Sequence, residues 1–338
     1  MIIQLNSNIT ESQKQQLEDR ISAGGFKTTD VHTQKSNYMV CTGSGKIDLR
    51  IIGNMEGIVD IHRVSDDYKL VSKKWKSSPT VIDLGDDVSV SSKGFSIMAG
   101  PCSIESEDQI RQTIQHLKNN NVRIMRGGVY KPRSSPYSFR GLGIDGLKLW
   151  YELAKEEGIK IVTEVMQVSQ IEEMYDYVDV YQVGARNTQN FNLLDELGKV
   201  DKPVMIKRGI SGTIDELLYS AEYVFSAGNE NLILCERGIR TYEKASRNTL
   251  DLNAIPILKE KSHLPVVADP SHGIGIRRHV EKMALASIMA GADGVIYETH
   301  ATPEKAFSDG QQTLNFEESE SLIQKMNQLV QFNESIIK

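Results

Sequence analysis

From residue 95 onward the chain alternates between short apolar runs and stretches in which apolar residues recur at helical spacing. The runs are rich in β-branched residues, as expected for parallel strands buried on both faces. They are Phe95–Cys102, Val122–Gly127, Ile159–Glu164, Val178–Gly184, Pro203–Lys207, Asn231–Glu236, Leu264–Asp269 and Gly294–Glu298. The predicted helices include Asp108–Asn119, Asp145–Glu156, Ile214–Ala227, Arg277–Met289 and Phe316–Phe332. Eight such units predict a (β/α)8 barrel over residues 95–338. The alternative is a doubly wound open sheet, which usually has fewer strands.

The first 65 residues follow a different pattern, β-α-β-β-α-β, which is typical of a ferredoxin-like α+β domain. Its predicted elements are strands Met1–Leu5, Phe26–Gln34, Asn37–Thr42 and Ile58–Val64, with a short helix at Ile47–Met55. Thr10 and Gln13 predict a capping box where the first helix begins, and Gly24-Gly25 predicts its end. Residues 66–94 are expected to form a polar linker and a β-hairpin, with strands at Thr80–Gly85 and Val88–Ser92.

Composition and charge narrow the class of protein. Hydrophobic residues make up 39% and charged residues 25%, which excludes disordered and collagen-like chains. No apolar run reaches about 18 residues, so we expect no membrane helix, and the N-terminus lacks the pattern of a signal peptide. Cys41, Cys102 and Cys235 are too few for a disulfide framework, which fits a reducing cytoplasm. The net charge of -6 argues against general nucleic-acid binding.

Every predicted strand of the barrel ends in polar or charged residues, and the active site of such barrels forms at those ends. The cations there are Arg126, Lys131, Arg133, Arg186, Lys207 and Arg237. Cations gathered at one mouth repel one another unless they bind anions, and arginine forks match phosphate and carboxylate oxygens. Ordinary surface ion pairs are the alternative. The shared placement at strand ends favours a ligand with more than one anionic group.

A second set at the strand ends has the composition of a metal site. It consists of Cys102, His272, Glu298 and Asp309. A thiolate, an imidazole and two carboxylates suit a borderline divalent cation that acts as a Lewis acid. The set lacks a diagnostic spacing, so Cys102 or His272 alone would be interpreted as a buried structural residue. Cys235 also ends a strand and is the rival thiol, although we interpret it as a packing residue.

Weaker candidates complete the site. Glu164 is a candidate for orienting a water or a lysine, and Asp269 for acting as a base or holding a ligand. Arg240 and His300 are interpreted as loop residues. The remaining histidines are expected on the surface; they are His32, His62, His116, His263 and His279.

Several strings of the chain, taken in order, carry a family resemblance. They are AGPCSIES, RGGVYKPRSSPYSFRGLG, QVGARNTQNF, KRG, ILCERGIRTYEKASRNTLD, DPSHGIG and EKAFSDGQQTL. Together they resemble 3-deoxy-D-arabino-heptulosonate 7-phosphate (DAHP) synthase of the type I beta subclass, over essentially the whole chain. That family condenses phosphoenolpyruvate with erythrose 4-phosphate, releases phosphate and opens the shikimate pathway.

The resemblance implies roles for individual residues. It implies a divalent metal on Cys102, His272, Glu298 and Asp309, with Mn, Fe, Co and Zn all left open. It assigns phosphoenolpyruvate to Arg126, Lys131, Arg186, Lys207 and Arg237, with Ala185 and Asp269 also at the substrate site. Arg133 and Ser134 would hold the aldose phosphate, although the family more often has Thr where Ser134 stands. Lys131 is the candidate for proton transfer to the aldehyde oxygen, and Glu164 for positioning the water.

Two rival functions stay open on the sequence. The first is 3-deoxy-D-manno-octulosonate 8-phosphate synthase, which uses arabinose 5-phosphate and typically has Lys-Ala-Asn-Arg where this chain has Lys131-Pro132-Arg133. The second is a non-catalytic phosphate-binding barrel, which would require a broken metal set or Lys131 loop. A fused chorismate mutase is rejected because the N-terminal stretch is too short and too rich in strands.

The N-terminal 65 residues are expected to regulate rather than catalyse. The resemblance implies feedback by an aromatic amino acid bound to this domain, and the polar linker Ser65–Lys76 would let it move across a neighbouring barrel mouth. An inert cap or an oligomer contact is the alternative. We also expect a homotetramer and a cytoplasmic location.

Overall fold

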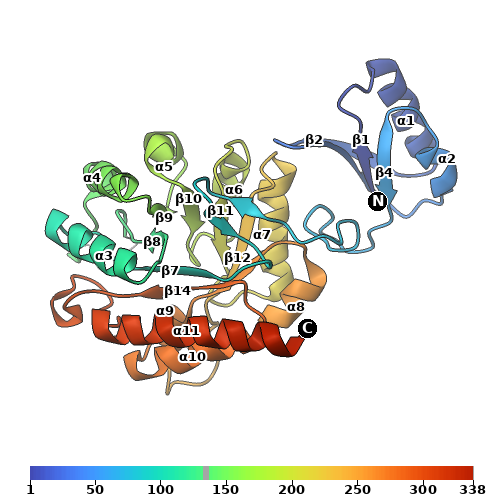
Figure 1. Ribbon diagram of the computed structural model, residues 1–338. Coiled ribbons are helices and arrows are strands. Elements are labelled where there is room, and N and C mark those ends of the chain that lie inside the picture. The colour runs from blue at the N-terminus through green and yellow to red at the C-terminus, as the bar shows by residue number, and fades with distance from the viewer. Residues whose placement is uncertain (132–136, 338) are drawn as a thin grey trace.

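The computed structural model describes residues 1–131 and 137–337, and it has two parts (Figure 1). The larger is a closed barrel of eight strands in the order β10-β11-β12-β13-β14-β7-β8-β9, and all its strand pairs are parallel. The strands are β7 (Ser96–Gly100), β8 (Ile124–Arg126), β9 (Lys160–Val165), β10 (Val180–Val183), β11 (Val204–Lys207), β12 (Leu232–Glu236), β13 (Val266–Ala268) and β14 (Gly294–Glu298). The closed order confirms the predicted barrel and excludes the open sheet.

Helices cover the outside of the barrel (Figure 1). They are α3 (Glu107–Asn119), α4 (Gly143–Glu156), α5 (Ser169–Met174), α6 (Phe191–Leu197), α7 (Ile214–Ser226), α8 (Ala254–Lys261), α9 (Pro270–Ile274), α10 (Arg277–Met289) and α11 (Phe316–Ile337), with short 3-10 turns at Tyr175–Tyr177 and Pro303–Lys305. The bounds of α10 coincide with the prediction, and those of α3, α4 and α7 differ from it by one or two residues at an end. The last helix continues to Ile337 rather than ending at Phe332.

A hairpin closes the N-terminal end of the barrel. Its strands are β5 (Ile82–Asp83) and β6 (Ser89–Val90). Ile82, Val88 and Val90 are buried in one cluster with apolar side chains from the barrel strands, such as Met98 and Met205. Because the hairpin fills this end with apolar side chains, the polar residues of the site are left at the opposite end, where the strands terminate.

The N-terminal sheet has the strand order β2-β3-β1-β4. Its elements are β1 (Ile2–Leu5), α1 (Glu11–Ala23), β2 (Lys27–His32), β3 (Asn37–Thr42), α2 (Leu49–Gly53) and β4 (Ile58–His62). The predicted capping box is present, because Thr10 accepts the backbone N–H of Gln13 and Gln13 accepts that of Thr10. Alternate side chains of β1 and β3, among them Ile3 and Met39, are buried in one cluster with the helix residues Leu17 and Ile21. This packing is the ferredoxin-like arrangement expected from the sequence.

The segment that joins the two parts is anchored to the barrel. The carboxylate of Glu222 in α7 accepts the backbone N–H groups of Lys69, Leu70 and Val71 at 2.8, 2.9 and 3.0 Å. Leu70 and Val71 are fully buried. Part of the predicted polar linker is therefore held on the barrel in this arrangement, because three of its backbone N–H groups share one partly buried acceptor on α7.

The N-terminal sheet contacts the barrel at the N-terminal ends of its strands, opposite to the candidate site (Figure 1). Thr33 Oγ1 donates to Glu230 Oε1 at 2.7 Å, and Lys35 Nζ donates to Asn231 Oδ1 at 2.9 Å. Both barrel residues precede β12. In this arrangement the N-terminal sheet does not lie over the C-terminal ends of the strands of its own barrel.

Two histidines expected on the surface are buried. His263 bonds Thr80 Oγ1 at 2.7 Å and the carbonyl oxygen of Leu70 at 2.8 Å, and burial lowers its pKa to about 3. His116 bonds Ser319 Oγ at 2.8 Å and stacks on a ring of α11, and burial lowers its pKa to about 4. The prediction was wrong because an imidazole can be buried when its ring nitrogens have hydrogen-bond partners. The partners of these two histidines lie far away in the chain.

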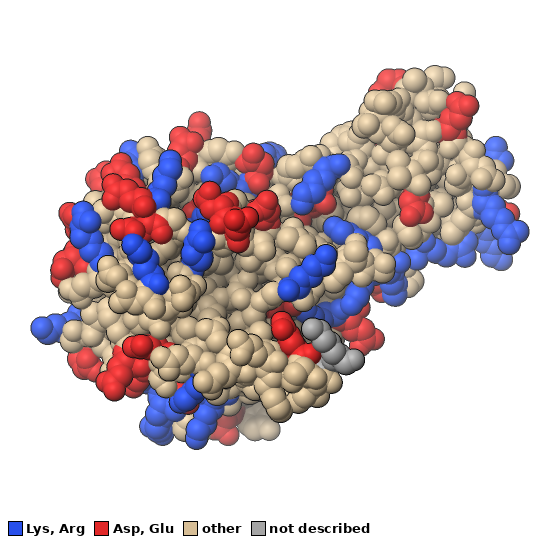
Figure 2. Space-filling model, viewed as in Figure 1, with Lys and Arg blue, Asp and Glu red and all other residues tan. Residues whose placement is uncertain are grey.

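The surface itself adds two observations. On the face seen in Figure 2, acidic and basic side chains are interspersed over the barrel. Within residues 1–131 and 137–337, no helix combines the length and apolar character needed to cross a bilayer.

Candidate active site

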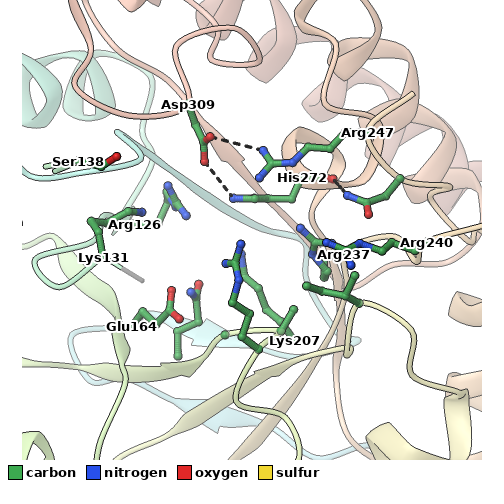
Figure 3. A pocket seen from close by; sticks show the side chains of 16 residues that line it. Arg126, Lys131, Ser138, Glu164, Lys207, Arg237, Arg240, Arg247, His272 and Asp309 are labelled. Carbon is green, nitrogen blue, oxygen red and sulfur yellow. Dashed lines mark hydrogen bonds and ion pairs between the residues drawn. The ribbon is translucent and has the colours of Figure 1, made fainter. Parts of the chain in front are cut away.

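The C-terminal ends of the barrel strands surround a cavity of about 410 Å³ (Figure 3). The predicted site residues that line it are Arg126, Lys131, Glu164, Ala185, Arg186, Lys207, Arg237, His272 and Asp309. Arg133 and Ser134 lie outside the described residues. The barrel thus gathers residues that are separated by more than 180 positions in the chain, because each follows or ends a strand of one closed sheet.

Three of the cavity's cations differ in how their charge is balanced. Arg126 pairs with Glu298 Oε1 at 3.1 Å, and Lys207 pairs with Asp269 Oδ2 at 2.5 Å. Arg237 is 6% exposed, and no carboxylate in the described part of the chain lies within 4.0 Å of its guanidinium. Desolvation, with the charge of Arg247 nearby, lowers its pKa. A buried arginine without an acidic partner is costly unless it binds an anion.

The thiolate, imidazole and carboxylate groups predicted to bind a metal lie close together. One ligand atom each from Cys102, Glu298 and Asp309 lies within 4.8 Å of the others. His272 Nε2 lies 3.4 Å from Glu298 Oε1 and 3.9 Å from Asp309 Oδ2. The sulfur and the two carboxylates form one compact group and the imidazole nitrogen lies beside the carboxylates, a donor chemistry that fits a borderline divalent cation.

Asp269 determines how His272 presents its ring. Its Oδ2 lies 2.8 Å from His272 Nδ1 and its Oδ1 accepts the backbone N–H of His272 at 3.0 Å. Burial alone would raise the pKa of Asp269, but His272 and Lys207 hold it well below its usual range. An ionised carboxylate at Nδ1 places the proton on that nitrogen, so Nε2 offers its lone pair to the cluster.

The two cysteines at strand ends have different surroundings. Cys102 Sγ lies 3.1 Å from Lys131 Nζ, and its thiol pKa is about 11, raised first by burial and then by Glu298. Cys235 lies fully buried in an apolar cluster with Met205 and Val267, and burial strongly raises its pKa. Cys235 belongs to no group of potential ligands among the described residues.

Lys131, in the loop after β8, and Glu164, in the adjacent strand β9, both line the cavity (Figure 3). Burial alone would lower the pKa of Lys131, but Cys102 and Glu164 are among the groups that raise it overall. Lys131 therefore carries a proton at neutral pH. Glu164 lies against Gly184, where an added Cβ would approach its Oε1 to 2.0 Å, so a side chain at position 184 would displace this carboxylate.

Sequence reasoning missed part of the cavity. Arg240, interpreted as a loop residue, lines it together with Arg247 and Asn248. All three come from the loop between β12 and α8, which also contains Arg237. The segment ILCERGIRTYEKASRNTLD contains all three residues. Their place in the cavity could not be predicted from strand ends, because it depends on how this long loop folds back over the cavity.

Comparison with known proteins gives a consistent result. Residues 80–334 match the model of the DAHP synthetase I family. The chain is 48% identical over 276 residues to a phospho-2-dehydro-3-deoxyheptonate aldolase of Thermotoga maritima, covering 82% of this chain and 81% of that protein. It is 32% identical over 255 residues to a 2-dehydro-3-deoxyphosphooctonate aldolase of Syntrophobacter fumaroxidans, covering 70% of this chain and 88% of that protein.

Solved structures are also similar to this chain, and one of them matches it over almost its full length. The crystal structure of the DAHP synthase from Thermotoga maritima matches with a TM-score of 0.78 at 42% identity, covering 98% of this chain and 97% of that one. A truncated form of the Thermotoga maritima enzyme matches with a TM-score of 0.73 at 45% identity, covering 78% of this chain and 97% of that one. The chain therefore belongs to the DAHP synthetase I family.

Proposed function

We propose that this chain condenses phosphoenolpyruvate with erythrose 4-phosphate to give DAHP and inorganic phosphate. The observation that carries the proposal is that the buried Arg237, which has no carboxylate partner among the described residues, lines one cavity with Asp309, a member of the cluster of Cys102, Glu298 and Asp309. The first feature suits a polyanionic substrate and the second suits a Lewis-acidic cation. The family is generally metal-dependent; we propose Mn, Fe, Co or Zn at this site.

The assignment of substrate-binding residues rests on the family resemblance, and the cations that line the cavity support it. We assign phosphoenolpyruvate to Arg126, Lys131, Arg186, Lys207 and Arg237, with Ala185 and Gln182 at the same wall of the cavity. Asp269 orients Lys207 and His272 rather than acting as a base, since its pKa lies well below the usual range. Arg133 and Ser134 remain our assignment for the phosphate of erythrose 4-phosphate.

The reaction consumes one water: it forms one carbon–carbon bond and one carbon–oxygen bond to the water oxygen, and it breaks the carbon–oxygen bond to the phosphate. The enol carbon of phosphoenolpyruvate attacks the aldehyde, water adds to the second carbon, and the hemiketal phosphate collapses with loss of phosphate. A divalent cation held by Cys102, His272, Glu298 and Asp309 supplies Lewis-acid polarisation of the aldehyde. Lys131, protonated at neutral pH, donates a proton to the aldehyde oxygen, and Glu164 positions the water. The arginines hold both anionic substrates in register.

The choice of aldose is the direct test. Phosphate release with Mn²⁺ and phosphoenolpyruvate should be fast with erythrose 4-phosphate and slow with arabinose 5-phosphate. A clear preference for the pentose phosphate would assign the chain to the octulosonate branch that its 32% identical relative represents. Release with neither aldose would favour the non-catalytic phosphate-binding barrel.

We also propose that different parts of the chain have different functions. Residues 1–65 form a regulatory domain that takes an aromatic amino acid, residues 66–94 form the linker and hairpin, and residues 95–338 form the catalytic barrel of a homotetramer. Since the N-terminal sheet lies at the far end of its own barrel, the mouth that it blocks belongs to another subunit.

A chain that begins at Lys76 tests this division. It should keep its condensation activity and lose all inhibition by tyrosine or phenylalanine, and light scattering should show the tetramer in the full chain. Removing Trp75 and Tyr38 uncovers Phe225, so a lower melting temperature is expected as well. Inhibition that survives truncation, or a full chain insensitive to aromatic amino acids, would rule out the regulatory role.

A further inference from the structure

A chain of hydrogen bonds connects the loop between β12 and α8 with two of the candidate metal ligands. An Arg247 terminal nitrogen donates to Gln312 Oε1 at 2.5 Å, and Gln312 Nε2 donates to Glu298 Oε2 at 2.7 Å. The same Arg247 nitrogen lies 3.5 Å from Asp309 Oδ1. We call Arg247 and Gln312 the bridge. It contacts both carboxylates of the cluster, and the mechanism above does not use it.

The chemistry of its partners determines the orientation of the bridge. A guanidinium can only donate and an ionised carboxylate can only accept, so the Gln312 carboxamide must turn its oxygen to Arg247 and its nitrogen to Glu298. Gln312 is 3% exposed, so water does not compete for these bonds. With its Oε2 held by Gln312, Glu298 turns its Oε1 toward Arg126 and His272, at 3.1 and 3.4 Å.

The loop that carries Arg247 is clamped onto the helix that carries His272. The N–H of Arg247 donates to the carbonyl of Ile274 at 3.1 Å, and Asn248 Nδ2 donates to the carbonyl of His272 at 2.8 Å. Arg247 lies so close to Gly275 that a Cβ added to this glycine would be 2.3 Å from the Cβ of Arg247. Gly275 also has a φ of 67°, a second reason for glycine at this contact.

We propose that Arg247 and Gln312 are positioning residues, which hold Glu298 and Asp309 in the orientation that binds the divalent cation. The inference rests on the proposed function for the identity of the site. It adds that hydrogen bonds connect the cation site to the loop between β12 and α8. That loop also contains Arg237, the residue that we assign to phosphoenolpyruvate. Hydrogen-bond partners behind metal ligands typically contribute 10- to 100-fold in affinity.

An electrostatic role and a positioning role predict opposite changes in cation affinity when Arg247 is replaced. A guanidinium beside a cation site repels the cation, so removing the charge should tighten cation binding if electrostatics alone acted. If the bridge positions the carboxylates, the loss of Arg247 should weaken binding despite the removed repulsion. Gln312 is neutral, so its replacement by methionine changes no charge and isolates the positioning effect.

The experiment measures Mn²⁺ binding to the full chain without substrates, from the electron paramagnetic resonance signal of free Mn²⁺. Gln312→Met and Arg247→Met should each weaken binding about 10- to 100-fold. Arg111→Met, which removes an exposed pair with Glu107 on α3, is the matched control and should bind as the unaltered chain does.

The outcomes separate the two proposals. Unchanged or tighter binding in Gln312→Met or Arg247→Met, or no Mn²⁺ binding by the unaltered chain, overturns the positioning role. If Gln312→Met does not fold by circular dichroism, the partly exposed Arg247 carries the test alone. The proposed function is judged separately, by phosphate release from the unaltered chain with erythrose 4-phosphate.

Discussion

Cys102→Ala should abolish condensation, with a loss of kcat of at least about 1000-fold. The thiol belongs to the cluster whose ligand atoms lie within 4.8 Å of one another, and alanine removes its only sulfur donor. The measurement is phosphate release at saturating Mn²⁺, together with the metal content of the purified protein. Both should fall, because the remaining imidazole and carboxylates hold a borderline cation less tightly.

Cys235→Ala is the matched control. This thiol lies near the end of β12 in the same barrel, but it is buried in the apolar interior with Met205 and Val267. Its replacement should leave activity largely intact and cost roughly 1 kcal/mol of the free energy of unfolding. An inactive Cys235→Ala beside an active Cys102→Ala would show that the wrong thiol was assigned to the metal.

Arg237→Met should raise the KM for phosphoenolpyruvate by about 100-fold, the effect of losing a desolvated bidentate contact with an anion. The same change should leave the melting temperature of the substrate-free protein equal or higher. The reason is that Arg237 is 6% exposed and has no carboxylate within 4.0 Å among residues 1–131 and 137–337, so methionine relieves an uncompensated charge. Steady-state kinetics and thermal unfolding together therefore separate a binding role from a structural one.

Arg240→Met provides the comparison for that result. Arg240 lines the same cavity from the same loop, but its side chain is exposed, so its loss should raise the KM only a few-fold and mainly at low salt. If Arg237→Met instead raised the KM for erythrose 4-phosphate alone, the assignment of Arg237 to phosphoenolpyruvate would be wrong.

The order of elements could be predicted well from the sequence. Buried parallel strands appear as β-branched runs, and helices that cover them show a 3.6-residue period, so the eight-stranded barrel and bounds such as those of α10 follow from local patterns. The site followed for the same reason. In a closed parallel barrel every strand terminates at one mouth, so residues such as Arg126 and Asp309 are brought together by topology alone.

Features that depend on partners distant in the chain required the tertiary structure. Glu222 anchors the linker because its side chain meets three N–H groups about 150 positions earlier. His263 is buried because Thr80 and Leu70 satisfy its ring.

The bridge of Arg247 and Gln312 arises where two loops cross, 65 residues apart. Sequence alone determined which chemical groups stand at the strand ends of this barrel, since strand ends are local features, but it did not show that Arg240 and Arg247 of the long loop also line the cavity. Only the packed structure decided which of those groups are paired and which are left to bind a ligand, because pairing depends on side-chain distances that no local pattern encodes.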